Sequence, residues 1–562
     1  MYVDMVGVLM PRRRPYTRGI RPAKDRRPSV RHGVNDSLYP HTIARSQTSK
    51  AVNFDMTPDG LLETRGGTQL LTDTAAGSTG ANPNLFQFVA RETTGALTLR
   101  TMLKSGTTLY QYNTSTGVFD SKQAGLSTNK ASMVNYVNSS GSEVMIYADG
   151  ENLLMYDGTT VSDIASNYTA GPGTDIPRYL FVKWNVLFAS GDDSNPDALI
   201  FCDPFQPNSA WPAAGSLLLE GGVDKITGIN EIGDHVLLTA IDSIHIVTGR
   251  TGATFAPIKV NSNVGCTSHW SIVSHGNVTY WANPTGFYMG RLRALEDEGM
   301  VVENISQHME NTYSGIESGG WDDIEGAYHP RLQEIFWSVK SDGASTVDQL
   351  FVYSTAQSRP LNAPPEFESG LDLRFVWAGY FTGIDFGSVA VIKDANGRSD
   401  LYAAGQTGLV HKMHTGYKDA RAVGVDTGTN IAYEIRSREE TYGGVARVME
   451  FLPTLYQKHN GGFNVQFLIN RSELFPSSVT NLTFKGNIPY WNDGNDENIS
   501  SQWNSTVWTE KPILLARTIL KKKCYSIIAI IKSSGSNTQE EGTWIGHDLR
   551  HQNISQKQGK AA

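Results

Sequence analysis

The sequence predicts an all-β protein whose central part is a β-propeller. Between residues 96 and 415, seven hairpins follow one another, and each joins two apolar runs through a turn. Their first strands start near residues 97, 144, 186, 235, 277, 334 and 389, so the repeat is 42–57 residues long. Four-stranded propeller blades have about this length, ~40–50 residues. The 55 Gly and 10 % aromatic residues also favour short strands and tight turns.

Most of these hairpins carry their own turn signal. Asp149-Gly150 and Asn396-Gly397 are strong turn dipeptides, while Asp242-Ser243 and Asn283-Pro284 join the strands of two other hairpins. A small sheet cannot bury both faces alone, and radial stacking covers the faces and leaves only short edges. We expect about six to eight blades. The alternative is a set of ordinary hairpins in unrelated β-sandwiches.

Four segments are predicted along the chain. Helix signals are few, and residues 301–316 are expected to form only a short connecting helix. After about residue 416 the alternating strands become longer, as in residues 462–473, which indicates a separate domain. The segments are a basic N-terminal arm (1–32), a β segment that closes or docks on the propeller (33–95), the propeller (96–415) and a C-terminal β-rich domain (416–562).

Charge argues against a general nucleic-acid binder. The formal net charge is −8, whereas affinity for nucleic acid comes from neutralising phosphates. Residues 12–31 are the local exception, with nine Arg or Lys against one Asp. This segment is either a solvated arm or an arm that docks on an acidic partner or on nucleic acid. Its candidate docking residues are Arg12, Arg13, Arg14, Arg18, Arg26 and Arg27.

The cysteines and the hydropathy pattern exclude two further classes. Cys202, Cys266 and Cys524 are odd in number and far apart, so they form neither a disulfide framework nor a Cys-rich zinc site. They are most simply reduced core residues of a protein assembled in a cytoplasm. No apolar stretch approaches the roughly 18 residues that a membrane helix needs, so we expect no membrane insertion.

No catalytic signature is found in the sequence. Phosphate-loop, zinc-protease, nucleophile-elbow and Cys-x-x-Cys motifs are all absent. The acidic pairs Asp192-Asp193 and Asp322-Asp323 are the candidates for glycosidase carboxylates, but both have the Gly-rich or Ser-rich surroundings of turns. His411 and His414 are a weak metal candidate, and residues 492–498 lack the spacing of a calcium loop. We therefore expect no enzymatic activity, no cofactor and no metal.

Several stretches together resemble the tail nozzle proteins of short-tailed bacteriophages. Residues 52–71, VNFDMTPDGLLETRGGTQLL, are similar to the N-terminal signature of that family. Residues 187–211 are similar to its strand–Gly–Asn-Pro–strand–Asp-Pro–Trp arrangement, 263–290 continue in the expected order, and 405–420 resemble its late strand. The resemblance covers residues 33–550, although Cys266 and the basic arm have no counterpart. The matching positions are Asn53, Gly60, Arg65, Gly67, Thr68, Pro196, Trp211, Gly265 and Gly286.

The resemblance implies a structural virion protein of the tail, also called a packaged-DNA stabilization protein. In the family, propellers form a six-fold ring below the portal and adaptor, extend the DNA channel for ejection, retain packaged DNA and support fibres or spikes. An acidic chain is compatible with this role, because a basic bore would hold the duplex along its length. The alternative is a glycan-binding or receptor-binding propeller, in which Trp491, Trp503 and Trp508 stack on sugars.

Overall fold

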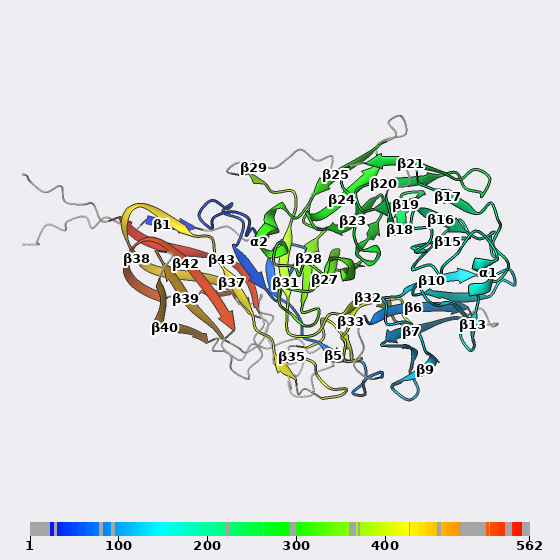
Figure 1. The fold of residues 1–562 in the computed structure, drawn as a ribbon. Helices are drawn as coiled ribbons and strands as arrows, with labels where there is room; N and C mark the ends of the chain where they lie inside the picture. Colours follow the sequence, from blue (N-terminus) through cyan, green and yellow to red (C-terminus); the bar gives the residue numbers. More distant parts are fainter. Residues whose placement is uncertain are drawn as a thin grey trace, which may run out of the picture.

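The computed structural model confirms the all-β class and the β-propeller (Figure 1). The few helical segments are single turns. They are α1 (Ala165–Thr169), η1 (His269–Ser271), η2 (Gln307–Met309), α2 (Glu310–Tyr313) and η3 (Trp321–Asp323). The structure describes residues 23–26, 31–77, 82–91, 96–219, 224–261, 263–292, 299–358, 367–368, 371–416, 418–425, 428–457, 462–470, 473–483, 513–515, 518–533 and 542–553.

Six blades are separate four-stranded antiparallel sheets, written here from the innermost strand outwards. The first is β6 (Asn84–Arg91), β7 (Leu97–Ser105), β8 (Thr108–Asn113) and β9 (Val118–Ala124). The second is β10 (Ser132–Val137), β11 (Glu143–Ala148), β12 (Leu153–Tyr156) and β13 (Val161–Asp163). The third is β14 (Tyr179–Lys183), β15 (Val186–Ser190), β16 (Ala198–Phe201) and β17 (Ser216–Leu218). The fourth is β18 (Ile226–Ile232), β19 (His235–Ala240), β20 (Ile244–Thr248) and β21 (Ala256–Asn261). The fifth is β22 (Val273–His275), β23 (Val278–Asn283), β24 (Gly286–Leu292) and β25 (Met300–Asn304). The last is β32 (Ser388–Lys393), β33 (Ser399–Ala404), β34 (Val410–Lys412) and β5 (Gln69–Leu70).

One further four-stranded unit completes the ring. It consists of β26 (Glu325–His329), β27 (Glu334–Val339), β28 (Gln349–Ser354) and β31 (Trp377–Phe381), and we call it the bridging blade. Its inner strand β26 contacts β22 on one side and β32 on the other, and β32 in turn contacts β6. The innermost strands therefore form a closed ring with seven positions. In Figure 1 the first and last blades lie side by side.

An N-terminal strand closes this ring. β5 pairs with β34 as the outer strand of the last blade, with His411 opposite Leu70 and Lys412 opposite Gln69. Closure by a distant segment removes the gap that an open sheet series would leave at its two ends. Within residues 33–95, β5 is thus the outer strand of the last blade.

The bridging blade also joins the propeller to the C-terminal domain. Its outer strand β31 pairs in parallel with β2 (Lys50–Val52), which pairs with β37 (Glu434–Arg436) in one 15-stranded sheet. The C-terminal sheet lies beside the propeller (Figure 1). The other strands of the 15-stranded sheet are β1 (Ala23–Arg26), β3 (Phe54–Met56), β4 (Leu62–Thr64), β38 (Glu440–Gln457), β39 (Gly462–Ile469), β40 (Glu473–Thr483), β41 (Ile513–Leu515), β42 (Thr518–Ser533) and β43 (Gly542–Asn553). Two small hairpins lie outside this sheet, β29 (Phe367–Glu368) with β30 (Leu371–Asp372), and β35 (Lys418–Asp419) with β36 (Thr429–Asn430).

Six of the seven predicted hairpins are the second and third strands of a ring unit, and the seventh is the first two strands of the last blade. Two boundaries differ from the prediction. The propeller starts at β6, not at residue 96, because a polar segment separates β6 from the more regular β7–β8 hairpin. The expected helix at 301–316 is wrong in its first turn, where Val302 belongs to β25 and pairs with Gly290.

Part of the predicted arm also has regular structure. Residues Ala23–Arg26 form strand β1, which pairs antiparallel with β43 of the C-terminal sheet, Arg26 opposite Asp548. The basic segment is thus anchored at this point to the C-terminal domain. Cys202 and Cys266 are buried and unpaired, as predicted, while the side chain of Cys524 lies outside the described residues.

Candidate functional site

The N-terminal family motif forms a buried joint where the propeller closes. Arg65 follows β4, and its side chain is fully buried. Its guanidinium donates to both carboxylate oxygens of Asp419, over 2.8 and 2.5 Å. Its Nε donates to Asn53 Oδ1 over 2.8 Å, and Nη2 also donates to the carbonyl of Thr382 over 2.8 Å. We call these four residues the closure joint.

Backbone contacts tighten the closure joint. A Cβ on Gly67 would lie 2.1 Å from the carbonyl oxygen of Lys418, so only glycine allows the two chains to approach this closely. Thr68 Oγ1 accepts the backbone N–H of Ala420 over 2.8 Å. Burial disfavours the charged guanidinium, but the carboxylate of Asp419 outweighs burial and raises the pKa of Arg65. Arg65 therefore stays charged in its ion pair with Asp419, and the role of this pair is structural.

The sequence identified one side of this joint and missed the other. Asn53, Arg65, Gly67 and Thr68 were selected, but Asp419 was not. A buried arginine requires a buried acid, so the motif itself indicates that a partner exists. Nothing in the sequence near residue 419 distinguishes this Asp from the turn aspartates elsewhere.

The remaining motif residues occupy separate structural positions. Gly60 lies in the turn before β4, and Gly286 begins β24. Pro196 accepts the backbone N–H of Ile226 at the start of the fourth blade. Trp211 is buried against Tyr168, at a ring distance of 5.1 Å. A Cβ on Gly265 would lie 2.1 Å from the carbonyl oxygen of Ala240.

The predicted docking arginines fall mostly outside the described residues. This is the case for Arg12, Arg13, Arg14, Arg18 and Arg27, as it is for Trp491, Trp503 and Trp508 and for residues 492–498. Arg26 lies in β1, in the pairing described above. Whether these residues dock on a partner stays a prediction.

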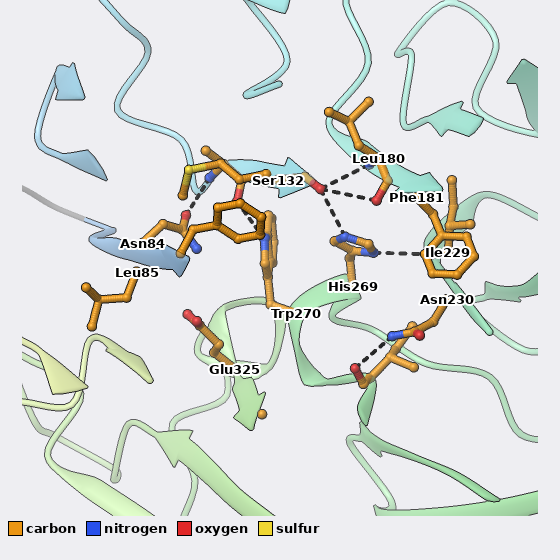
Figure 2. Close-up of a pocket in the computed structure, with 15 residues that line it drawn as sticks. Asn84, Leu85, Ser132, Leu180, Phe181, Ile229, Asn230, His269, Trp270 and Glu325 are labelled. Carbon is orange, nitrogen blue, oxygen red and sulfur yellow. Dashed lines mark hydrogen bonds between the residues drawn. The ribbon is translucent and has the colours of Figure 1, made fainter. Parts of the chain in front are cut away.

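A cavity of ≈ 240 Å³ lies on the propeller axis. Figure 2 shows Asn84, Ser132, Leu180, Asn230 and other inner-strand residues around it. His269 and Trp270 of η1 also line it, and their contacts reach across the ring. Although η1 lies between the fourth and fifth blades, Trp270 Nε1 donates to the carbonyl of Ala131, next to the inner strand of the second blade, over 2.9 Å. The single turn η1 therefore lies across the axis.

Several polar groups around the cavity have partners within the protein. Ile229 N–H donates to His269 Nδ1 over 3.2 Å, and His269 Nε2 lies 3.3 Å from Ser132 Oγ. Burial lowers the pKa of His269 to about 3, so the ring is neutral near pH 7. The nearly buried Lys130 Nζ lies 2.8 Å from Glu325 Oε2, and Ser388 Oγ donates to Glu325 Oε1 over 2.8 Å.

One of the candidate catalytic carboxylates, Asp192, serves local structure. Asp192 is fully buried, and it accepts backbone N–H groups from Ser194, Asn195 and Thr174, as a turn aspartate does. Asp322 and Asp323 lie in η3. Among the described residues, no group of three or more His, Cys, Asp or Glu is placed to hold a metal ion. Within the same residues, no helix has the length and apolar character to cross a bilayer.

Comparisons with known proteins give little beyond this description. No family profile matches the chain, and no curated protein matches its sequence. Solved structures that align include a chain of a mitotic checkpoint complex, with 11 % identity, 74 % of this chain and 98 % of that chain covered, and a TM-score of 0.31. The extracellular domain of the putative one component system BT4673 from B. thetaiotaomicron aligns with 12 % identity, 77 % and 58 % coverage, and a TM-score of 0.38. TM-scores this low carry no argument, and the fold rests on the strand order and the ring of contacts.

Proposed function

We propose that the chain is a structural protein of a bacteriophage tail, a nozzle subunit that assembles into a six-fold ring. The ring extends the DNA channel below the portal and adaptor, retains packaged DNA until ejection, and supports fibres or spikes. The chain has no enzymatic role in this proposal. It is assembled in the host cytoplasm and resides in the virion.

The observation that carries the proposal is the closure joint. Four positions of the family resemblance, Asn53, Arg65, Gly67 and Thr68, come together at one buried contact. They therefore act as one architectural unit that links the N-terminal segment, the last blade and the start of the C-terminal domain. A motif of this kind supports a building block and not a reaction centre.

In this proposal the propeller axis itself is not the DNA channel. The single turn η1 lies across the axis, where Trp270 reaches Ala131. A DNA duplex, whose major groove alone is about 12 Å wide, does not pass through an axis that is crossed in this way. In the proposed ring, the channel lies between subunits, and the closed propellers form its wall. Heterologous contacts between copies close such a ring.

Binding to a portal–adaptor complex tests the proposal. The purified full chain is mixed with portal–adaptor assemblies of short-tailed phages and sedimented, with adaptor-free portal as the control. Co-sedimentation that depends on the adaptor is expected. Failure to bind any such assembly, together with saturable binding to host surface glycans, would favour the receptor-binding propeller instead.

A further inference from the structure

Three positively charged side chains converge on one carboxylate where the bridging blade meets the last blade. Arg331 lies in the turn between β26 and β27, Arg398 directly precedes β33, and Lys412 is the last residue of β34. The two blades are neighbours in the ring, because β26 contacts β32. All three cations face Asp400 of β33, and we call these four residues the basic cluster.

Asp400 holds the three cations unequally. Lys412 Nζ lies 2.6 Å from Oδ2, whereas Arg398 Nε and Arg331 Nη2 lie 3.3 and 3.9 Å from Oδ1. The two guanidinium groups thus share one carboxylate oxygen. Among the described residues, neither guanidinium has another hydrogen-bond or ion-pair partner. Because a guanidinium carries five N–H donors, most donors of both arginines are free.

The two arginines are open to solvent, while the carboxylate between them is not. The side chain of Arg331 is 50 % exposed and that of Arg398 is 59 % exposed, against 6 % for Asp400. Burial opposes the ionisation of Asp400, but Lys412 and the two arginines outweigh burial and lower its pKa. Asp400 is therefore ionised at neutral pH and cancels one of the three positive charges.

Asp394 is the acidic residue of the adjoining turn. Its Oδ1 accepts the backbone N–H groups of Asn396 and Arg398, over 2.9 and 2.8 Å, so this carboxylate serves the turn. With Asp394 counted, three positive charges still face two negative ones. In a chain with a net charge of −8, this surplus is a local site of attraction for an anion.

The geometry of the basic cluster suits phosphate groups on an extended polymer. Guanidinium forks match the oxygens of a phosphate, and an ammonium group adds a point charge. The cluster lies at turns of two adjacent blades, and none of its residues lines the axial cavity. Such an open position does not enclose a small molecule. Double-stranded DNA carries one negative charge per about 1.7 Å of its axis, so several phosphates can approach the cluster together.

We propose that the basic cluster contacts the phosphate backbone of double-stranded DNA, with Arg331 and Arg398 as the phosphate-binding residues and Lys412 as the residue that holds Asp400. The contact is independent of base sequence, since phosphates carry no sequence information. One small patch attracts the duplex without holding it along its length. The identity of the polyanion rests on the proposed nozzle function, whereas the basic cluster belongs to each single chain.

Titration of the full chain with a short fluorescent duplex at several salt concentrations tests this contact. Each phosphate contact contributes about tenfold to the binding constant at about 50 mM salt. Arg331→Gln combined with Arg398→Gln should therefore weaken binding by about a hundredfold and reduce the slope of log K against log salt by about two. Arg331→Lys combined with Arg398→Lys keeps both charges and should keep the slope. Asp400 stays paired with Lys412 in both variants, so neither strands a buried charge.

Hydrogen exchange gives a local readout that DNA binding elsewhere on the chain does not move. Addition of the duplex should slow exchange in residues 329–333 and 394–400 of the wild type, and not in the glutamine double variant. Protection of these residues by polyglutamate or by inorganic phosphate, and not by the duplex, would overturn the proposal.

Lys50→Gln combined with Arg436→Gln is the matched control. This variant also removes two of three cations around one carboxylate, that of Glu434. There Arg436 Nε already donates to Glu434 Oε1 over 2.6 Å, and the other two cations are lysines, so this group offers no pair of free forks. Duplex binding by the control should stay near that of the wild type, and equal losses in the two glutamine double variants would overturn the proposal.

The test also separates the basic cluster from the nozzle role. Binding to portal–adaptor complexes without protection of residues 329–333 and 394–400 by the duplex would overturn the DNA contact and leave the nozzle role standing. Protection by the duplex in a chain that does not bind portal–adaptor complexes would support the DNA contact and count against the nozzle role.

Discussion

The Arg65–Asp419 ion pair should be among the most sensitive contacts of the protein. Both side chains are almost completely buried, at 0 % and 2 % exposure, and two of the guanidinium's hydrogen bonds go to the carboxylate. Arg65→Met leaves Asp419 buried without its counter-charge, a loss of about 3–5 kcal/mol in comparable buried pairs. It also leaves the Thr382 carbonyl without a donor, at about 1–3 kcal/mol for a buried group, whereas Asn53 Oδ1 still accepts the backbone N–H of Thr382. Relaxation and water entry reduce the sum, so we expect a loss of about 4 kcal/mol.

A double-mutant cycle separates the pair from its surroundings. Arg65→Met, Asp419→Leu and the double variant are compared with the wild type by urea unfolding, with hydrogen exchange of the segments around residues 53 and 419 as a local probe. The double variant should be more stable than Arg65→Met, because it removes the stranded charge. The coupling energy should exceed about 2 kcal/mol.

Two controls make the result interpretable. Arg250→Met removes one partner of the exposed Arg250–Asp234 ion pair and should leave the free energy of unfolding unchanged. Local exchange should rise at residues 53 and 419 in Arg65→Met and not in this control. Additive effects of Arg65→Met and Asp419→Leu, with no coupling energy, would refute the inference that the Arg65–Asp419 ion pair stabilises the fold.

Three further outcomes follow from the structure. Trp270→Ala removes the bond from η1 to Ala131 and enlarges the axial cavity, so urea unfolding should show a loss of about 3 kcal/mol; an unchanged midpoint would mean that η1 does not brace the ring. Gly265→Ala places a methyl group against the Ala240 carbonyl and should cost about 1–3 kcal/mol in the same assay, and a neutral result would show that this contact relaxes freely. Neutralising the arm upstream of β1 should leave thermal unfolding unchanged but weaken co-sedimentation with portal–adaptor assemblies, whereas undiminished co-sedimentation would remove the arm from the docking surface. The changes in that variant are Arg12→Gln, Arg13→Gln, Arg14→Gln and Arg18→Gln.

The repeat pattern of the sequence was sufficient to predict the propeller. Turn dipeptides such as Asp149-Gly150 specify the hairpins locally, and the spacing between successive hairpins matches the length of a propeller blade. The strand pairing that closes the last blade could not be predicted in the same way. Strand β5 pairs with a strand some 340 residues away in the chain and is only two residues long. Neither the hydrophobic period nor the turn residues of a sequence indicate such a distant pairing.

The candidate sites show the same limit. Arg65 and Thr68 could be selected from the sequence because they belong to a recognisable local motif. Their partners Asp419 and Ala420 could not, because only the closed ring brings residues 65–68 and 418–420 together. Glu334 likewise looks like an ordinary strand residue until the backbone N–H of Met56 in β3 donates to it. Local patterns specify elements, whereas the chemistry of a joint depends on distant segments.

Electron microscopy of the purified chain, combined with its mass in solution, tests the central proposal most directly. Six copies of the 61.6-kDa chain should form rings of about 370 kDa, either alone or on an added portal–adaptor complex. Each ring should show an open central channel surrounded by solid propellers. A chain that stays monomeric both alone and in the presence of portal–adaptor complexes would contradict the nozzle assignment.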